Sequence, residues 1–379
     1  MSLLYNDQHD CRSYASARRA AQWTPPIGGS VVTLPDTKQR GDITAEARER
    51  KTSAKDEAMD GELSKALETF HRPMPSDSML QFTVTEDGYK KIVEERGRCN
   101  RKYRVWYDGY SYTVTIICCP SVLHNMAAVM VVDSIVEEAV RVLRTAGISD
   151  DVISRITKTG NETSASDSRT RSYREPDGTV LFEDRTSPRI HRIVLEVGFS
   201  QNYVPLQRAT MWWLEEKISP VAILLCLTER HKSSGASRRL FRRKEDKDAE
   251  MEKYIEAFDR QQRQGNHALG PLVYDGYSWF GTLQQAFFET WRRTDTGIVK
   301  NGPLYLVNDG LDVSVATPLD LGDFTLGDIV PSNAGIGDVM RSSALNFVRP
   351  QTYMQLLSNA IFRTALNRVA ETFEIEERP

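Results

Sequence analysis

Short apolar runs alternate with segments of helical spacing between residues 100 and 228. The run Ile193–Phe199 is β-branched and apolar apart from Glu196, which predicts a strand buried on both faces of a sheet. Val221–Thr228 predicts a second buried strand, and Pro205–Lys217 between the two runs predicts a helix. We therefore expect the first strand at the centre of a sheet, with the second beside it and the helix packed across both.

The flanking segments extend this pattern. Asp108-Gly109 separates Tyr103–Tyr107 from Tyr110–Cys119, which is a strong signal for a β-hairpin. Helical spacing follows over His124–Ala146, and Gln351–Phe373 predicts an amphipathic terminal helix. This order of elements predicts an α/β (α+β) core, in which a mixed central β-sheet is flanked by helices.

Composition divides the chain into five regions. The N-terminal region is polar and charge-mixed, which predicts disorder with one short helix at Glu62–Phe70. Between Arg230 and Lys244 the chain has seven Lys or Arg and no acid, and a charged helix follows, so we expect this insertion to protrude. The expected boundaries are 1–78 (mostly disordered), 79–229 (α/β core), 230–270 (basic, charged helical insertion), 271–345 (β-rich continuation) and 346–379 (C-terminal helix).

The overall composition is that of a soluble globular protein. Of 379 residues, 40% are hydrophobic and 27% charged, and the net charge is −3. The five cysteines have no CxxC spacing and read as reduced residues, which predicts an intracellular protein of the cytoplasm or nucleus. The sequence shows neither a signal peptide nor an apolar stretch of about 18 residues, so we expect no membrane partner.

Glu196 is the most informative candidate residue. An ionised carboxylate in a buried strand is unfavourable unless a cation or strong donors compensate it. Further acids lie upstream in Arg174-Glu175-Pro176-Asp177-Gly178, just before another apolar stretch. Two acids on neighbouring strands can hold a divalent metal and drive phosphodiester hydrolysis. Alternatively, a buried arginine such as Arg192 or Arg208 neutralises Glu196, and the Pro-Asp-Gly sequence is only a turn.

The order of several motifs carries a resemblance to a known family. The segments are Tyr103–Asp108, Cys119–His124, Glu175–Asp177, Leu195–Gln201 and Glu289–Arg292. Over roughly residues 100 to 325 the series resembles a group of fungal proteins with the PD-(D/E)XK nuclease-like fold, the restriction endonuclease-like fold. The resemblance implies that Asp177 and Glu196 bind Mg²⁺ or Mn²⁺ and that the partner is DNA or RNA. Nucleases of this fold often pair, which suggests a homodimer.

The sequence also departs from this family. The superfamily pattern has a lysine two residues after the glutamate, where it stabilises charge on the phosphate, but this chain has Gly198. Lys217, on the next helix, is the nearest replacement by sequence, and Gln201 offers a polar contact instead. Group members often carry an acid directly after the histidine, here Asn125, and His124 itself reads as a capping or packing residue.

Three functional hypotheses follow. The first is a metal-dependent nuclease, with Asp177, Glu196, Gln201 and Lys217 as catalytic residues and with one carboxylate of elevated pKa in the absence of metal. The second is a non-catalytic descendant that binds nucleic acid or protein. The third is an effector-like protein-binding factor. The candidate phosphate-contacting residues are Arg169, Arg171 and Arg174 near the site, and Arg238, Arg239, Arg242 and Arg243 in the basic insertion.

Overall fold

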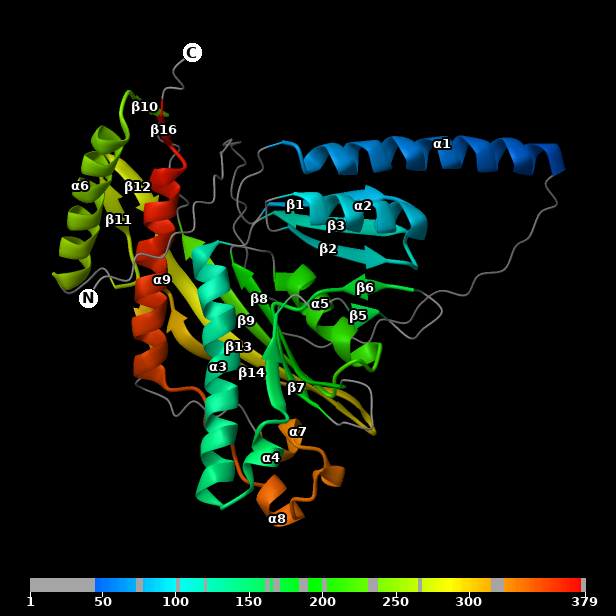
Figure 1. Cartoon of the computed structure of the whole chain (residues 1–379), viewed down its shortest axis with the longest axis vertical. Coiled ribbons are helices and arrows are strands. Elements are labelled where there is room, and N and C mark those ends of the chain that lie inside the picture. The colour runs from blue at the N-terminus through cyan, green and yellow to red at the C-terminus, as the bar shows by residue number, and fades with distance from the viewer. Residues whose placement is uncertain are drawn as a thin grey trace.

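The computed structural model describes most of the chain from residue 45 onward. The described ranges are 45–72, 78–99, 103–118, 121–160, 164–165, 171–183, 190–199, 203–230, 238–264, 268–314 and 324–375. Within them the strands form a seven-stranded sheet, a five-stranded sheet and two two-stranded pairs (Figure 1). In the same residues, no helix is long and apolar enough to cross a membrane.

The large sheet is mixed, as the sequence predicts. Its order is β15-β14-β13-β9-β8-β7-β4, with β8 and β9 parallel and the other neighbours antiparallel. The strands are β4 (Ile156–Thr159), β7 (Gly178–Phe182), β8 (Ile190–Phe199), β9 (Val221–Arg230), β13 (Thr282–Thr294), β14 (Gly297–Asn308) and β15 (Leu311–Asp312). The predicted core and its β-rich continuation therefore contribute to one sheet.

Helices cover both faces of the central strands. On one face α3 (Val122–Thr145) packs against β7 and β8, and α9 (Pro350–Ala370) packs against α3 (Figure 1). On the other face α5 (Tyr203–Glu215) crosses β8, β9 and β13. Leu195 and Val197 join the core on the α3 side, whereas Leu224 joins the core under α5. Burial on both faces explains the continuous apolar run of β8.

The small sheet has a core of its own. Its order is β1-β3-β2-β6-β5, and two helices accompany it. The elements are α1 (Ala45–Thr69), β1 (Met79–Thr83), α2 (Glu86–Arg98), β2 (Tyr103–Asp108), β3 (Thr113–Cys118), β5 (Ser164–Ala165) and β6 (Tyr173–Arg174). The predicted β2–β3 hairpin is confirmed. The helix expected at Glu62–Phe70 is much longer, and residues 1–44 lie outside the described ranges.

The helix of the charged insertion packs against the core. The prediction that residues 230–265 protrude is therefore wrong for this helix. In α6 (Lys244–Arg263), Tyr254 and Phe258 are fully buried and belong to the main core. Their spacing of four residues places them on one side of the helix, where Tyr254 packs against Trp279 and Phe373. The insertion is also tied down by β10 (Arg239–Phe241), which pairs in parallel with β16 (Phe373–Ile375). The remaining elements are α4 (Asp150–Ile153), β11 (Leu272–Tyr274), β12 (Tyr277–Phe280), α7 (Leu326–Ile329) and α8 (Asp338–Arg341).

Candidate functional site

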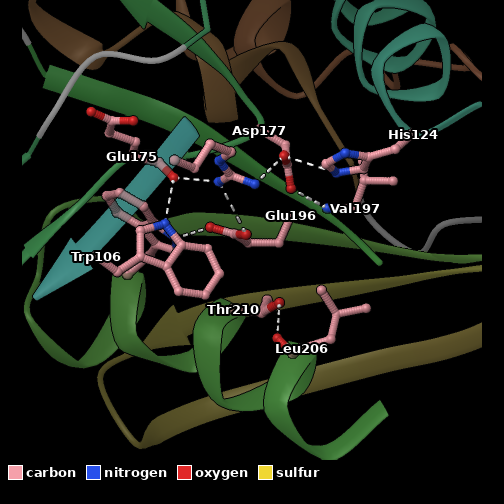
Figure 2. Close-up of polar contacts among 10 residues, drawn as sticks. Trp106, His124, Glu175, Asp177, Glu196, Val197, Leu206 and Thr210 are labelled. Atoms are coloured by element: carbon pink, nitrogen blue, oxygen red, sulfur yellow. Dashed lines mark hydrogen bonds and ion pairs between the residues drawn. The ribbon is translucent and has the colours of Figure 1, made fainter. Parts of the chain in front are cut away.

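The sheet register brings Asp177 and Glu196 together. Strands β7 and β8 pair with Gly178 opposite Leu195, so Asp177 stands at the start of β7 beside the middle of β8. The backbone N–H of Asp177 donates to the carbonyl of Leu195 at 3.1 Å. The carboxylate Oδ2 of Asp177 accepts a hydrogen bond from the N–H of Val197 at 2.7 Å (Figure 2). The chain turn before β7 thus delivers one acid next to the other.

Arg104, on β2 of the small sheet, provides the cation between these acids. Its Nη1 forms an ion pair with Oδ1 of Asp177, and its Nη2 lies 3.9 Å from Oε2 of Glu196. Nη2 also donates to the backbone carbonyl of Glu175. The exposed fractions of the side chains are 7% for Arg104, 4% for Asp177 and 1% for Glu196. The two carboxylates therefore share a guanidinium in a setting that excludes water.

Two neighbouring helices supply further donors. The indole Nε1 of Trp213, on α5, donates to Oε1 of Glu196 at 2.6 Å. On the opposite face, Nε2 of His124 lies 2.9 Å from Oδ1 of Asp177 (Figure 2). Ser121 caps α3 by accepting the N–H of His124 at 3.2 Å, which holds the imidazole at the helix start. His124 is thus a partner of the acidic pair as well as a residue of the capped turn.

The two carboxyl groups have opposite pKa shifts. Burial and the nearby charge of Asp177 raise the pKa of Glu196 to about 7, although Arg104 and the Trp213 indole oppose the rise. Burial alone would also raise the pKa of Asp177, but Arg104, His124 and the Val197 N–H outweigh it and hold the pKa below its ordinary value. The predicted elevation of one carboxyl pKa is therefore confirmed, and it falls on Glu196.

A divalent metal does not fit this arrangement as it stands. Both oxygens of Asp177 already accept from donors, and the guanidinium of Arg104 lies between the two acids. Among the described residues, no group of three or more His, Cys, Asp or Glu side chains gathers as a ligand set. The predicted carboxylate pair exists, but its present partners are the guanidinium of Arg104, the imidazole of His124 and N–H donors.

Gly198 leaves no room for the lysine of the superfamily pattern. A Cβ atom at Gly198 would lie 2.5 Å from Cδ2 of Leu206, which packs down from α5 onto this face of β8. Lys217, the predicted replacement, has an exposed side chain in the turn that follows α5. Gln201, the other predicted catalytic residue, lies outside the described residues.

Arg174 is half-buried and lies in an aromatic stack. Its guanidinium carbon lies 5.2 Å from the ring centre of Trp106 and 5.0 Å from that of Trp212. The Nη1 atom of Arg174 is buried without a hydrogen-bond partner, and burial lowers the pKa of this side chain. The stack joins β2 and β6 of the small sheet to α5, which packs on the large sheet.

The other predicted phosphate contacts are mostly paired with acids of the same chain. Arg171 bonds Glu86 at 3.0 Å. In the basic insertion the partners are Glu374 for Arg238 at 2.8 Å, Glu250 and Asp275 for Arg239, and Asp246 for Arg243 at 2.9 Å. Arg242 is exposed, and Arg169 lies outside the described residues. Arg238, Arg239 and Arg243 of the basic insertion therefore have acidic partners within the chain.

The sequence interpretation missed Arg104, although the signal was present. An arginine inside the apolar run of β2 is as unusual as a glutamate inside β8, and each marks a buried charge that needs a partner. The proposed alternative partner Arg192 instead donates to the carbonyls of Gly327, Asp328 and Ile329. A second missed cluster surrounds the buried Glu289, which accepts from Tyr203 at 2.7 Å, Lys300 at 2.7 Å and Trp291 at 3.2 Å.

Comparison with protein-family models and with curated proteins gives no match to this chain.

Proposed function

We propose that this chain is a non-catalytic interaction module built on a PD-(D/E)XK nuclease-like core. The observation that carries the proposal is the closed space at Gly198, where the side chain of Leu206 fills the position of the catalytic lysine. Without a lysine there, the described residues lack the cation that stabilises the charge developing on a phosphate in the superfamily pattern. The acidic pair nearby is buried and bonded to Arg104, which gives a substrate no open path to it.

The ion pairs favour a protein as the partner. Binding to nucleic acid draws most of its affinity from lysines and arginines that contact phosphates. Here Arg171, Arg238, Arg239 and Arg243 are bonded to acids of the same chain, and the net charge is −3. A polyanion would have to compete with these internal acids, whereas a protein surface with mixed charges can pair with both the acid and the arginine of each ion pair.

The proposal is tested by assaying the full chain on single- and double-stranded DNA and RNA with millimolar Mg²⁺ or Mn²⁺. We expect no cleavage, and the same background in Asp177→Ala, which controls for a contaminating nuclease. Binding to the same nucleic acids is measured over a salt series, and we expect no complex at physiological salt. Cleavage that disappears in Asp177→Ala would overturn the non-catalytic proposal. Binding with a steep salt dependence would make nucleic acid the partner.

A further inference from the structure

The guanidinium of Arg104 lies between two buried carboxylates, where their negative charge requires a cation. Its guanidinium reaches Asp177 with one nitrogen and approaches Glu196 with another, and its Nε is buried without a hydrogen-bond partner. If hydrogen bonding alone determined the position of this side chain, all of its N–H groups would have acceptors. Its placement follows charge instead, because two buried acids require a positive group between them.

The same guanidinium joins two structural units. Arg104 belongs to the small sheet, whose buried apolar cluster is separate from the clusters of the large sheet. The joint between the units is polar and aromatic: Trp106 donates to the Glu175 carbonyl at 3.2 Å, and Arg96 forms an ion pair with the Glu175 carboxylate. Arg104 is the member of this joint that reaches both Asp177 and Glu196.

We propose that the guanidinium of Arg104 takes the place of a divalent cation between Asp177 and Glu196, so that the pair becomes a site for Mg²⁺ or Mn²⁺ once the guanidinium is removed. Carboxylate oxygens are ligands that these hard cations prefer. In the native chain the arginine therefore acts as a built-in counterion, and the joint between the two sheets needs no metal. This inference does not depend on whether the chain cuts nucleic acid.

Divalent-cation rescue tests the proposal. Thermal melts of the full chain are recorded with and without millimolar MgCl₂ or MnCl₂, and Mn²⁺ binding is followed by electron paramagnetic resonance. The wild type should show no shift in melting temperature. Arg104→Ala should melt at a lower temperature, recover several degrees with Mn²⁺ and bind a single Mn²⁺ per chain. The double variant Arg104→Ala/Asp177→Asn should lose both the recovery and the binding.

Arg96→Ala is the matched control. Arg96 also joins α2 to the loop before β7 through an ion pair, but it contacts Glu175 and not the pair of acids. It should be destabilised without recovering in Mn²⁺. Should Arg104→Ala fail to fold, Arg104→Gln removes the charge with a smaller loss of volume, and its response to Mn²⁺ decides in the same way.

Three results would overturn the proposal. They are a Mn²⁺ shift in the wild type equal to that in Arg104→Ala, no shift in either Arg104 variant, or an equal recovery in Arg96→Ala. The failure of the proposed function is a separate result, because it is read from cleavage and nucleic-acid binding by the wild type.

Discussion

The side chain of Asp177 extends the hydrogen-bond pairing of β7 with β8 by bonding to Val197. Its Oδ2 accepts the N–H of Val197 at 2.7 Å, while its own N–H donates to the carbonyl of Leu195 at 3.1 Å. The two bonds flank Glu196 and fix the acid of one strand against the acid of the next. Backbone pairing therefore places both carboxylates against the guanidinium of Arg104, which compensates the repulsion between them.

The first prediction concerns the pH dependence of stability. The pKa of Glu196 is raised from 4.5 to about 7, so the folded state holds this proton more tightly than the unfolded state. Stability should fall as the pH rises from about 4.5 to about 7 and should be flat above that range. At about 1.4 kcal/mol for each pKa unit, the loss attributable to Glu196 is on the order of 2 to 4 kcal/mol.

Glu196→Gln tests this dependence because it keeps the acceptor for Trp213 and removes the titration. Urea unfolding of both proteins at pH 5 and pH 8 gives the comparison, and the difference between them cancels the other titrating groups. The variant should lose less stability than the wild type between the two pH values. Parallel losses would mean that Glu196 has an ordinary pKa in the folded chain.

The second prediction concerns packing at Gly198. In Gly198→Ala the new Cβ would meet Leu206 at 2.5 Å, and Leu206 is almost fully buried, so we expect a loss of about 1–3 kcal/mol. Truncating Leu206 makes room for it. The same Gly198→Ala change should therefore cost much less in a Leu206→Ala background, as measured by a double-mutant cycle of unfolding free energies.

Gly97→Ala is the matched control for this cycle. No atom lies within 4 Å of a Cβ at Gly97, which is an exposed position near the end of α2. This substitution should be neutral or slightly stabilising, because alanine is the better helix former. Additive effects of Gly198→Ala and Leu206→Ala would show that Leu206 does not limit the size of a side chain at position 198.

Much of the fold could be predicted from the sequence, because its central elements carry strong local patterns. The apolar runs of β8 and β9, the helical spacing of α5 and α3, and the turn of the β2–β3 hairpin each depend on neighbouring residues. The helix α2 was missed because it is polar and short of apolar positions; only Gly88, Tyr89 and Ile92 are buried in it.

The candidate site could be predicted only in part. The burial of Glu196 and its closeness to Asp177 follow from the apolar run and from the resemblance of the motifs. The identity of the compensating cation did not follow, because Arg104 lies 73 residues from Asp177 in the sequence and belongs to the other sheet. A buried acid shows that a cation is needed, but local patterns do not distinguish a metal from a distant arginine.

The third prediction concerns the charged insertion. Tyr254 and Phe258 of α6 are fully buried, and Phe258 also packs against Phe362 of α9. Phe258→Ala should therefore destabilise the chain by about 3–5 kcal/mol. Asp248→Ala on the exposed side of the same helix is the control and should change stability by less than about 0.5 kcal/mol. A small effect of Phe258→Ala in thermal or urea unfolding would mean that α6 is a solvated insertion that contributes little to the core.

The last prediction concerns the ion pair that fastens α9 to the large sheet. Both oxygens of Glu229, at the end of β9, accept from the guanidinium of Arg368 at 2.8 and 2.7 Å, and Oε1 also accepts the N–H of Gly281 at 2.7 Å. The Glu229 side chain has an exposed fraction of 0%. Arg368→Ala leaves this carboxylate buried and short of a cation, so we expect a loss of about 3–5 kcal/mol at neutral pH.

Arg368→Lys separates charge from geometry at the same position. An ammonium keeps the charge but cannot form the two parallel bonds of the guanidinium, so this variant should lie between the wild type and Arg368→Ala. In Glu229→Gln/Arg368→Met the buried charge is removed together with its partner, and most of the lost stability should return. Urea unfolding at pH 7 measures all four proteins. If the double variant is as unstable as Arg368→Ala, the loss comes from the contact of the Arg368 guanidinium with the Phe280 ring, and not from the uncompensated carboxylate.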